Sequence, residues 1–141
     1  MLLLISSSGG MDYNLRRLDT TELISFSPPN SSIGPIKLPE PIRYHCSVLI
    51  DDKVYVIGGT SKTPDVLKSV YSISIHDGKI ANHSDMINKR AKHGCASFKI
   101  GNKTLIAVGF GSFGWHKTEI MDVQDNVWFQ GSKGFIAFHK C

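Results

Sequence analysis

A strand–turn–strand pattern occurs twice in this chain of 141 residues, and this repeat limits the available folds more than any other feature. The segment VYSISIHDGKI, residues 70–80, aligns with TEIMDVQDNVW, residues 118–128, at a constant offset of 48 positions. Apolar residues recur at equivalent positions, because Ile73 aligns with Met121, Ile75 with Val123 and Ile80 with Trp128. Asp77-Gly78 aligns with Asp125-Asn126, and both pairs favour the positive φ angles of a tight hairpin turn. Each segment is therefore predicted to form a β-hairpin.

The residues upstream of each predicted hairpin also repeat. Residues 43–59 (RYHCSVLIDDKVYVIGG) and 90–111 (RAKHGCASFKIGNKTLIAVGFG) each contain an Arg, a His, two apolar strands around a polar turn, and a glycine stop. The alignment predicts two repeats of four short strands each. The strands are expected near 46–50, 54–57, 70–76 and 79–82 in the first repeat, and near 95–100, 104–108, 118–124 and 127–130 in the second.

An incomplete third copy is predicted at the N-terminus. LLLISSSGG, residues 2–10, has the form of a strand with a glycine stop, and residues 13–23 have the form of a hairpin. SPPNSSIGPIKLPEP, residues 27–41, has the composition of a Pro- and Ser-rich connector. The expected organisation is a partial repeat with its connector at 1–42, complete repeats at 43–83 and 84–130, and a tail or the start of another repeat at 131–141.

The predicted fold class is all-β, because no stretch shows helical periodicity and turn signals recur about every 8–12 residues. Four strands in about 50 residues is the size of a kelch-type propeller blade. The chain resembles the kelch repeat family in its YVIGG strand, in Arg90 and His93 before a first strand, and in Asp122 and Trp128. The resemblance covers residues 40–130 well and residues 1–40 loosely. It implies four-stranded antiparallel blades in an incomplete ring. The chain is therefore expected to be a fragment of a longer propeller, the product of a truncated gene, or a chain that completes its ring by oligomerising, and the start in mid-blade favours a fragment.

Several positions are predicted to serve the repeat itself and not a ligand. Glycine lacks a Cβ atom, so it fits where a strand ends in a sharp turn against a neighbouring blade, and tryptophan supplies a large apolar body between sheets. The second repeat departs from the family pattern because Phe110 interrupts its glycine pair, and in the first repeat Ile80 stands in place of the tryptophan. The structural repeat positions are Gly58, Gly59, Gly109, Gly111 and Trp128.

The sequence GFGSFG, residues 109–114, fits the dinucleotide-binding pattern G-x-G-x-x-G and follows an apolar strand. That function requires a helix next and an acidic residue about 20 positions later. The repeat alignment instead predicts a strand at 118–124. The glycines therefore mark strand ends, and no cofactor is expected.

The three cysteines, Cys46, Cys95 and Cys141, are odd in number and widely spaced. They are predicted to remain reduced thiols, which fits a cytoplasmic protein. His45 and His93 lie near cysteines, and His–Cys pairs can bind metal ions. Because these histidines occupy equivalent positions of different repeats, they are predicted to be structural, and no metal site is expected.

Charge and hydropathy exclude several classes of partner. The formal net charge is +4, and the basic residues are scattered apart from a local group at 89–92. Nucleic-acid binding would require a basic face with stacking aromatic residues, which the pattern lacks. The N-terminal apolar run is too short for a signal peptide, and no apolar stretch reaches the roughly 20 residues that cross a membrane.

The resemblance implies a protein-interaction module, acting in substrate recognition or as a scaffold. Kelch propellers commonly bind a peptide or protein partner through loops at one end of the ring, and here those loops are expected at 60–68, 84–92 and 112–117. Acidic or phosphorylated partners suit their basic side chains. The predicted contact residues are Lys62, Lys68, Arg90, Lys92, Trp115, His116 and Lys117.

An enzyme is the alternative function. Some kelch-fold proteins are copper radical oxidases resembling galactose oxidase, which draw their ligands from several blades and from an additional domain. No such domain is expected here, so the chain is predicted not to be an enzyme. An incomplete ring also leaves apolar blade flanks uncovered, and self-association through these open edges is expected.

Overall fold

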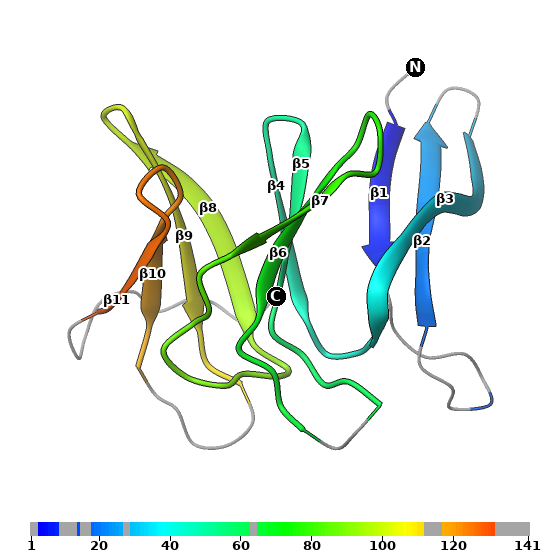
Figure 1. Cartoon of the computed structure of the whole chain (residues 1–141). Coiled ribbons are helices and arrows are strands. Elements are labelled where there is room, and N and C mark those ends of the chain that lie inside the picture. The colour runs from blue at the N-terminus through cyan, green and yellow to red at the C-terminus, as the bar shows by residue number, and fades with distance from the viewer. Residues whose placement is uncertain are drawn as a thin grey trace. The chain divides into compact units, whose positions relative to one another are not determined.

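A computed structural model describes the chain at residues 3–8, 14, 18–26, 29–62, 65–111 and 117–131. Over these residues the chain forms eleven strands and no helix (Figure 1), which confirms the all-β prediction. The described residues therefore contain no helix that could cross a membrane. The chain divides into two compact units, residues 1–43 with 60–65, and residues 44–59 with 66–141.

The first unit contains a three-stranded antiparallel sheet with the strand order β1-β2-β3. Its strands are β1 (Leu3–Ser8), β2 (Leu18–Phe26) and β3 (Pro29–Ile42). The predicted connector at 27–41 is therefore wrong, because most of it is strand β3. Its prolines are tolerated because β3 is an edge strand, and Pro35, Pro39 and Pro41 fall at positions that have no partner in the β2–β3 register.

The second unit contains two four-stranded antiparallel sheets, with the strand orders β4-β5-β6-β7 and β8-β9-β10-β11. We call them the first and the second blade. The predicted strands of both repeats are confirmed to within two residues at each end. The first blade consists of β4 (Cys46–Ile50), β5 (Lys53–Ile57), β6 (Val70–Ser74) and β7 (Ile80–His83). The second consists of β8 (Gly94–Ile100), β9 (Lys103–Gly109), β10 (Glu119–Asp122) and β11 (Val127–Gln130).

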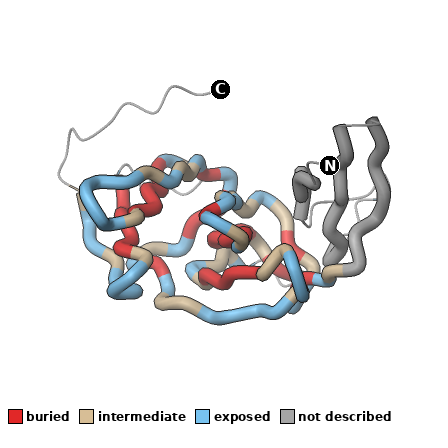
Figure 2. The backbone as a smooth tube through the Cα atoms, turned by 90° about the horizontal axis from the view of Figure 1, so that it is seen from above, coloured by how far each residue is buried: buried red, intermediate tan, exposed pale blue. Residues whose placement is uncertain are grey.

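The hydrophobic core of the second unit lies between the two blades. Side chains alternate between the faces of a strand, so each blade presents one apolar face to the other. Buried residues concentrate on β5, β6, β9 and β10, the central strands of both sheets. Figure 2 shows the buried positions in red. The core residues are Ile50, Tyr55, Ile57, Val70, Met86, Ile106, Val108 and Met121.

The outer strands are joined by polar contacts through Ser84, which follows β7. The Ser84 amide donates to Asn126 Oδ1 at 2.9 Å, and its hydroxyl donates to the Asn126 carbonyl at 2.7 Å. Trp128 packs against the core, and its Nε1 donates to the Ser84 carbonyl at 2.9 Å. The tryptophan therefore supplies both apolar area and a directed hydrogen bond between the blades.

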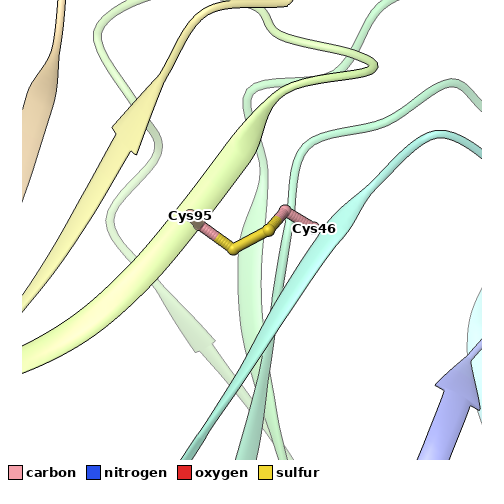
Figure 3. Close-up of a disulfide and its surroundings, with 2 residues drawn as sticks. All are labelled: Cys46 and Cys95. Atoms are coloured by element: carbon pink, nitrogen blue, oxygen red, sulfur yellow. A yellow bond between two sulfur atoms is a disulfide. The ribbon is translucent and has the colours of Figure 1, made fainter. Parts of the chain in front are cut away.

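The first strands of the two blades, β4 and β8, lie side by side and are linked covalently. Cys46 and Cys95 form a disulfide with their Cα atoms 6.0 Å apart (Figure 3). The prediction of reduced thiols is therefore wrong for these two residues, and Cys141 lies outside the described residues. The expectation of a cytoplasmic location rested on free thiols, so it loses that support.

The reason for the pairing is a shift of one position between the repeats. When His45 is aligned with His93, Cys46 aligns with Gly94 and not with Cys95. Neighbouring positions of a strand point to opposite faces. Cys46 therefore faces the following blade and Cys95 faces the preceding one, and the two thiols meet in the interface.

Candidate functional site

The strand order gathers one set of connections at the same end of the second unit. Because the strands in each sheet are antiparallel, the tight hairpins lie at one end of the unit. The ends of β5 and β9, the starts of β6 and β10, and the linker between the blades lie at the other end, lower in Figure 1. We call this second end the loop end. Its described residues within the second unit are 44–45, 58–59, 66–69, 85–93, 110–111 and 117–118.

Backbone hydrogen bonds fix the linker between the blades to the first blade. The Gly59 amide donates to the Arg90 carbonyl at 2.8 Å, and the Arg90 amide donates to the Leu67 carbonyl at 3.0 Å. The Met86 amide donates to the Lys68 carbonyl at 2.8 Å, while the Met86 side chain is buried in the core. The loop end is therefore a hydrogen-bonded surface and not a set of separate loops.

Glycine is required where the linker meets β5. Gly58 has a φ angle of 62°, and a Cβ atom there would lie 2.6 Å from the Arg90 carbonyl oxygen. Gly59 and Gly111 also have positive φ angles, whereas Gly109 lies at the buried end of β9 without one. At Gly58 both the backbone conformation and the lack of space exclude a side chain.

Arg90 is a buried structural residue, so its predicted role as a contact residue does not fit. Its guanidinium is 1% exposed and forms an ion pair of 2.9 Å with Glu119, which is fully buried. Arg90 Nη1 donates to the Phe110 carbonyl at 3.1 Å, and Nη2 also donates to the Lys117 carbonyl. The burial follows from the fold, because this arginine lies where the linker crosses the start of the second blade.

Glu119 accepts hydrogen bonds from the linker as well. The Ile87 amide donates to its Oε2 at 2.7 Å, and the Asn88 amide and side chain donate to its Oε1 at 3.2 and 2.9 Å. A buried carboxylate needs this number of donors to offset the loss of water. The network joins the linker to β10 and holds the shape of the loop end.

Four lysines are exposed at the loop end. Lys68 lies 3.8 Å from Asp85, with both side chains about half exposed. Lys92 Nζ lies 4.7 Å from the centre of the Tyr44 ring, a cation–π geometry. Lys89 and Lys117 are exposed. Asp85 is the one exposed carboxylate among the described residues of this end.

The other predicted contact residues lie elsewhere. Lys62 is exposed and belongs to the first unit. Trp115 and His116 lie outside the described residues. Of the seven predicted residues, Lys68, Lys92 and Lys117 are exposed at the loop end.

Sequence reasoning did not select two exposed aromatic residues of this end. Tyr44 is 39% exposed and Phe110 is 51% exposed. The repeat alignment could have identified both residues. When His45 is aligned with His93, Tyr44 aligns with the predicted contact residue Lys92, and Phe110 interrupts the glycine pair of the second repeat. Each departure from the repeat marks a side chain that the structure presents to solvent.

Two histidines of the loop end, His45 and His93, have lowered pKa values. Burial lowers the pKa of His45 to about 4. Burial also lowers the pKa of His93 to about 4, and the charges of Arg90 and His45 act in the same direction. Both imidazoles are therefore neutral at pH 7. Among the described residues, no group of three or more His, Cys, Asp and Glu side chains could hold a metal ion.

The arrangement of the two sheets defines the class of protein. Two four-stranded antiparallel sheets, packed face to face with their first strands adjacent, are consecutive blades of a β-propeller that do not close into a ring. Residues 41–79, which include most of the first blade, match the kelch motif. Over these residues the chain is similar to kelch repeat proteins. A search of curated proteins found no match.

Proposed function

We propose that this chain is a protein-interaction module, not an enzyme, and that the loop end of its second unit binds an acidic or phosphorylated peptide segment. Kelch repeats commonly mediate protein interactions, which supports the general role. The observation that carries the specific role is the uneven charge of the two ends. Carboxylate and phosphate groups form charge-assisted hydrogen bonds with ammonium groups, so the more basic end is the better candidate for recognition.

The loop end is basic because its acidic side chains are few or already neutralised. Lys68, Lys89, Lys92 and Lys117 are exposed there, whereas Asp85 is the one exposed carboxylate in its described part. Glu119 is buried against Arg90 and adds no negative surface.

The hairpin end of the second unit is not basic. Its turns and strand ends carry lysines and aspartates in nearly equal number, and some of these pair with one another, as Lys103 does with Asp122 and Asp125. Clustered charge of one sign raises the local concentration of oppositely charged ligands. The contrast between the ends therefore favours the loop end for an acidic partner.

Fluorescence polarisation of the purified full chain tests this proposal. The probes are three fluorescein-labelled peptides of equal length, rich in glutamate, in phosphoserine or in lysine. We expect the glutamate and phosphoserine peptides to bind and the lysine peptide not to bind, with affinity that falls as salt rises. The double variant Lys89→Glu/Lys117→Glu is expected to weaken binding by about tenfold, which corresponds to about 1.4 kcal/mol.

A matched control makes the same change of charge at the other end. Lys79 and Lys99 are exposed and lie near hairpins of the two blades. The variant Lys79→Glu/Lys99→Glu should weaken binding much less than the loop-end variant. Equal losses in the two variants would show that net charge alone attracts the peptide, and the proposed location would be wrong.

Self-association of the second blade is proposed as well. Its face directed away from the first blade includes Ile100, Val127 and Phe129, which are 63%, 52% and 47% exposed. The register places Val127 and Phe129 on the same face as the buried Ile120. We expect light scattering to show dimers whose dissociation constant rises in the variant Val127→Lys/Phe129→Lys. A strictly monomeric wild-type chain at high concentration would refute this.

A further inference from the structure

We propose that Tyr44, Lys92 and Phe110 form a single contact surface that holds an acidic group of a bound peptide together with a neighbouring aromatic or aliphatic side chain. We call these three residues the aromatic–lysine triplet. This inference rests on the proposed function, because it names the peptide chemistry that the loop end would select.

Five residues other than glycine have positive φ angles in the described part of the chain. Asp51 and Asn126 lie in hairpin turns, and short Asx side chains tolerate this conformation well. Tyr44, Lys92 and Phe110 have φ angles of 60°, 55° and 62°. For side chains of this size the conformation costs roughly 1–2 kcal/mol each, and such residues concentrate at functional sites.

All three strained residues lie at the loop end, next to strand ends. Tyr44 lies two residues before β4, Lys92 two residues before β8, and Phe110 directly after β9. The Lys92 amide donates to the Tyr44 carbonyl at 2.8 Å, so these two segments are hydrogen bonded. The side chain of Lys92 then extends over the Tyr44 ring.

Phe110 is held against the same stretch of linker. Its carbonyl accepts a hydrogen bond of 3.1 Å from Arg90 Nη1. At the next residue, Gly111, a Cβ atom would lie 2.8 Å from the Ala91 carbonyl oxygen, so the two backbones are in contact there. The β9 end and the segment that carries Lys92 therefore form one continuous surface.

The first repeat shows that glycine would satisfy the backbone at the position of Phe110. Gly58 has the same φ angle of 62° after β5, and each of these residues is followed by a glycine with positive φ. A glycine would remove the strain at Phe110, and the benzyl side chain, which is 51% exposed, gains little from burial. A contact with a partner is the benefit that offsets the strain.

The chemistry of the triplet defines the occupant. An ammonium group above an aromatic face keeps N–H donors for a carboxylate or phosphate oxygen. The exposed parts of Tyr44 and Phe110 offer apolar area to the side chain beside that acid. Lys89 and Lys117, on the same end, add attraction for further acidic groups. The preferred ligand is thus an acidic peptide with an apolar residue next to its acid.

The test uses the full chain with four labelled peptides that differ at two positions. The acid is glutamate or phosphoserine, and the neighbouring residue is phenylalanine or serine. We expect the phenylalanine peptides to bind about tenfold more tightly than their serine counterparts. The phosphoserine and glutamate arms show which acid is preferred.

Variants Phe110→Gly and Tyr44→Gly separate binding from folding. Each removes strain, so the melting temperature should stay the same or rise, while the preference for phenylalanine peptides should largely disappear. Asp51→Gly is the matched control, because it relieves a positive φ at the hairpin end and should leave the preference unchanged. A variant with a raised melting temperature and an unchanged preference would overturn the inference.

The outcomes also separate this inference from the proposed function. If acidic peptides bind and depend on Lys89 and Lys117, but the phenylalanine preference is absent or survives both glycine variants, only the aromatic–lysine triplet is wrong. If no acidic peptide binds, both proposals are wrong.

Discussion

The disulfide between Cys46 and Cys95 allows a quantitative prediction, because it joins positions 49 residues apart in the sequence. Closing a loop of this length restricts the unfolded chain, and the chain-entropy relation gives about 4 kcal/mol of stabilisation. The total free energy of unfolding of a typical domain is only about 5–15 kcal/mol. Loss of the bond should therefore remove a large share of the stability of the second unit.

The perturbation is the double variant Cys46→Ser/Cys95→Ser, compared with the oxidised wild type. Urea unfolding followed by tryptophan fluorescence reports on the interface, because Trp128 packs between the blades. With a typical m-value of about 2 kcal/mol/M, the midpoint should fall by about 2 M. Cys141→Ser is the matched control and should leave the midpoint unchanged.

Reduction provides a second route to the same quantity. Dithiothreitol should lower the midpoint of the wild type and have no effect on the Cys46→Ser/Cys95→Ser variant. Peptide mapping by mass spectrometry under non-reducing conditions should recover a cross-linked pair containing both cysteines. If the substitutions and the reductant each change the free energy of unfolding by less than about 0.5 kcal/mol, the argument that this bond stabilises the blade interface is refuted.

Three further predictions concern the residues that build the loop end. Glu119→Gln should lower the free energy of unfolding in urea by roughly 3–5 kcal/mol, because it leaves a buried guanidinium without its counter-charge. The control Lys68→Ala removes one partner of an exposed pair and should cost less than about 1 kcal/mol. Equal losses in the two variants would contradict the argument. The folded-state pKa of His93, about 4, lies below the ordinary value of 6.5. Its contribution of about 3 kcal/mol is therefore present above pH 6.5 and lost as the pH falls to 4. Unfolding measured across this range should show that loss, and His93→Leu should reduce the slope; an unchanged slope would assign the loss to other groups. Gly58→Ala should lower the melting temperature by several degrees, because its Cβ would lie 2.6 Å from a carbonyl oxygen. Gly94→Ala should not lower it, because a Cβ there meets open space. Similar melting temperatures for the two variants would count against this crowding.

The two blades could be predicted from sequence because the signals for them are local. A short apolar run between turn residues identifies a strand, and Asp77-Gly78 identifies a turn, without reference to any distant residue. The order of antiparallel strands also decides which connections share an end, so the strand prediction indicates which connections meet at the loop end. The N-terminal connector was assigned wrongly, because prolines lower strand propensity and their tolerance at an edge strand depends on the whole sheet.

The individual site residues were harder to predict, because exposure depends on packing. Arg90 and Lys92 are two positions apart in the same basic stretch, yet the first is buried against Glu119 and the second is exposed beside Tyr44. Charge and composition do not distinguish them. The distinction arises only when the linker is placed against β10.

The sequence by itself determined the repeat, its strands and its turns, because apolar runs and turn chemistry act over a few residues. Only the tertiary structure decided which groups meet across the blades. Cys46 and Cys95 differ by one position in the repeat, and that difference turns them to opposite faces of their strands and therefore toward each other. The buried arginine and the exposed aromatic–lysine triplet arise in the same way, since blade packing decides which side chains lose contact with water.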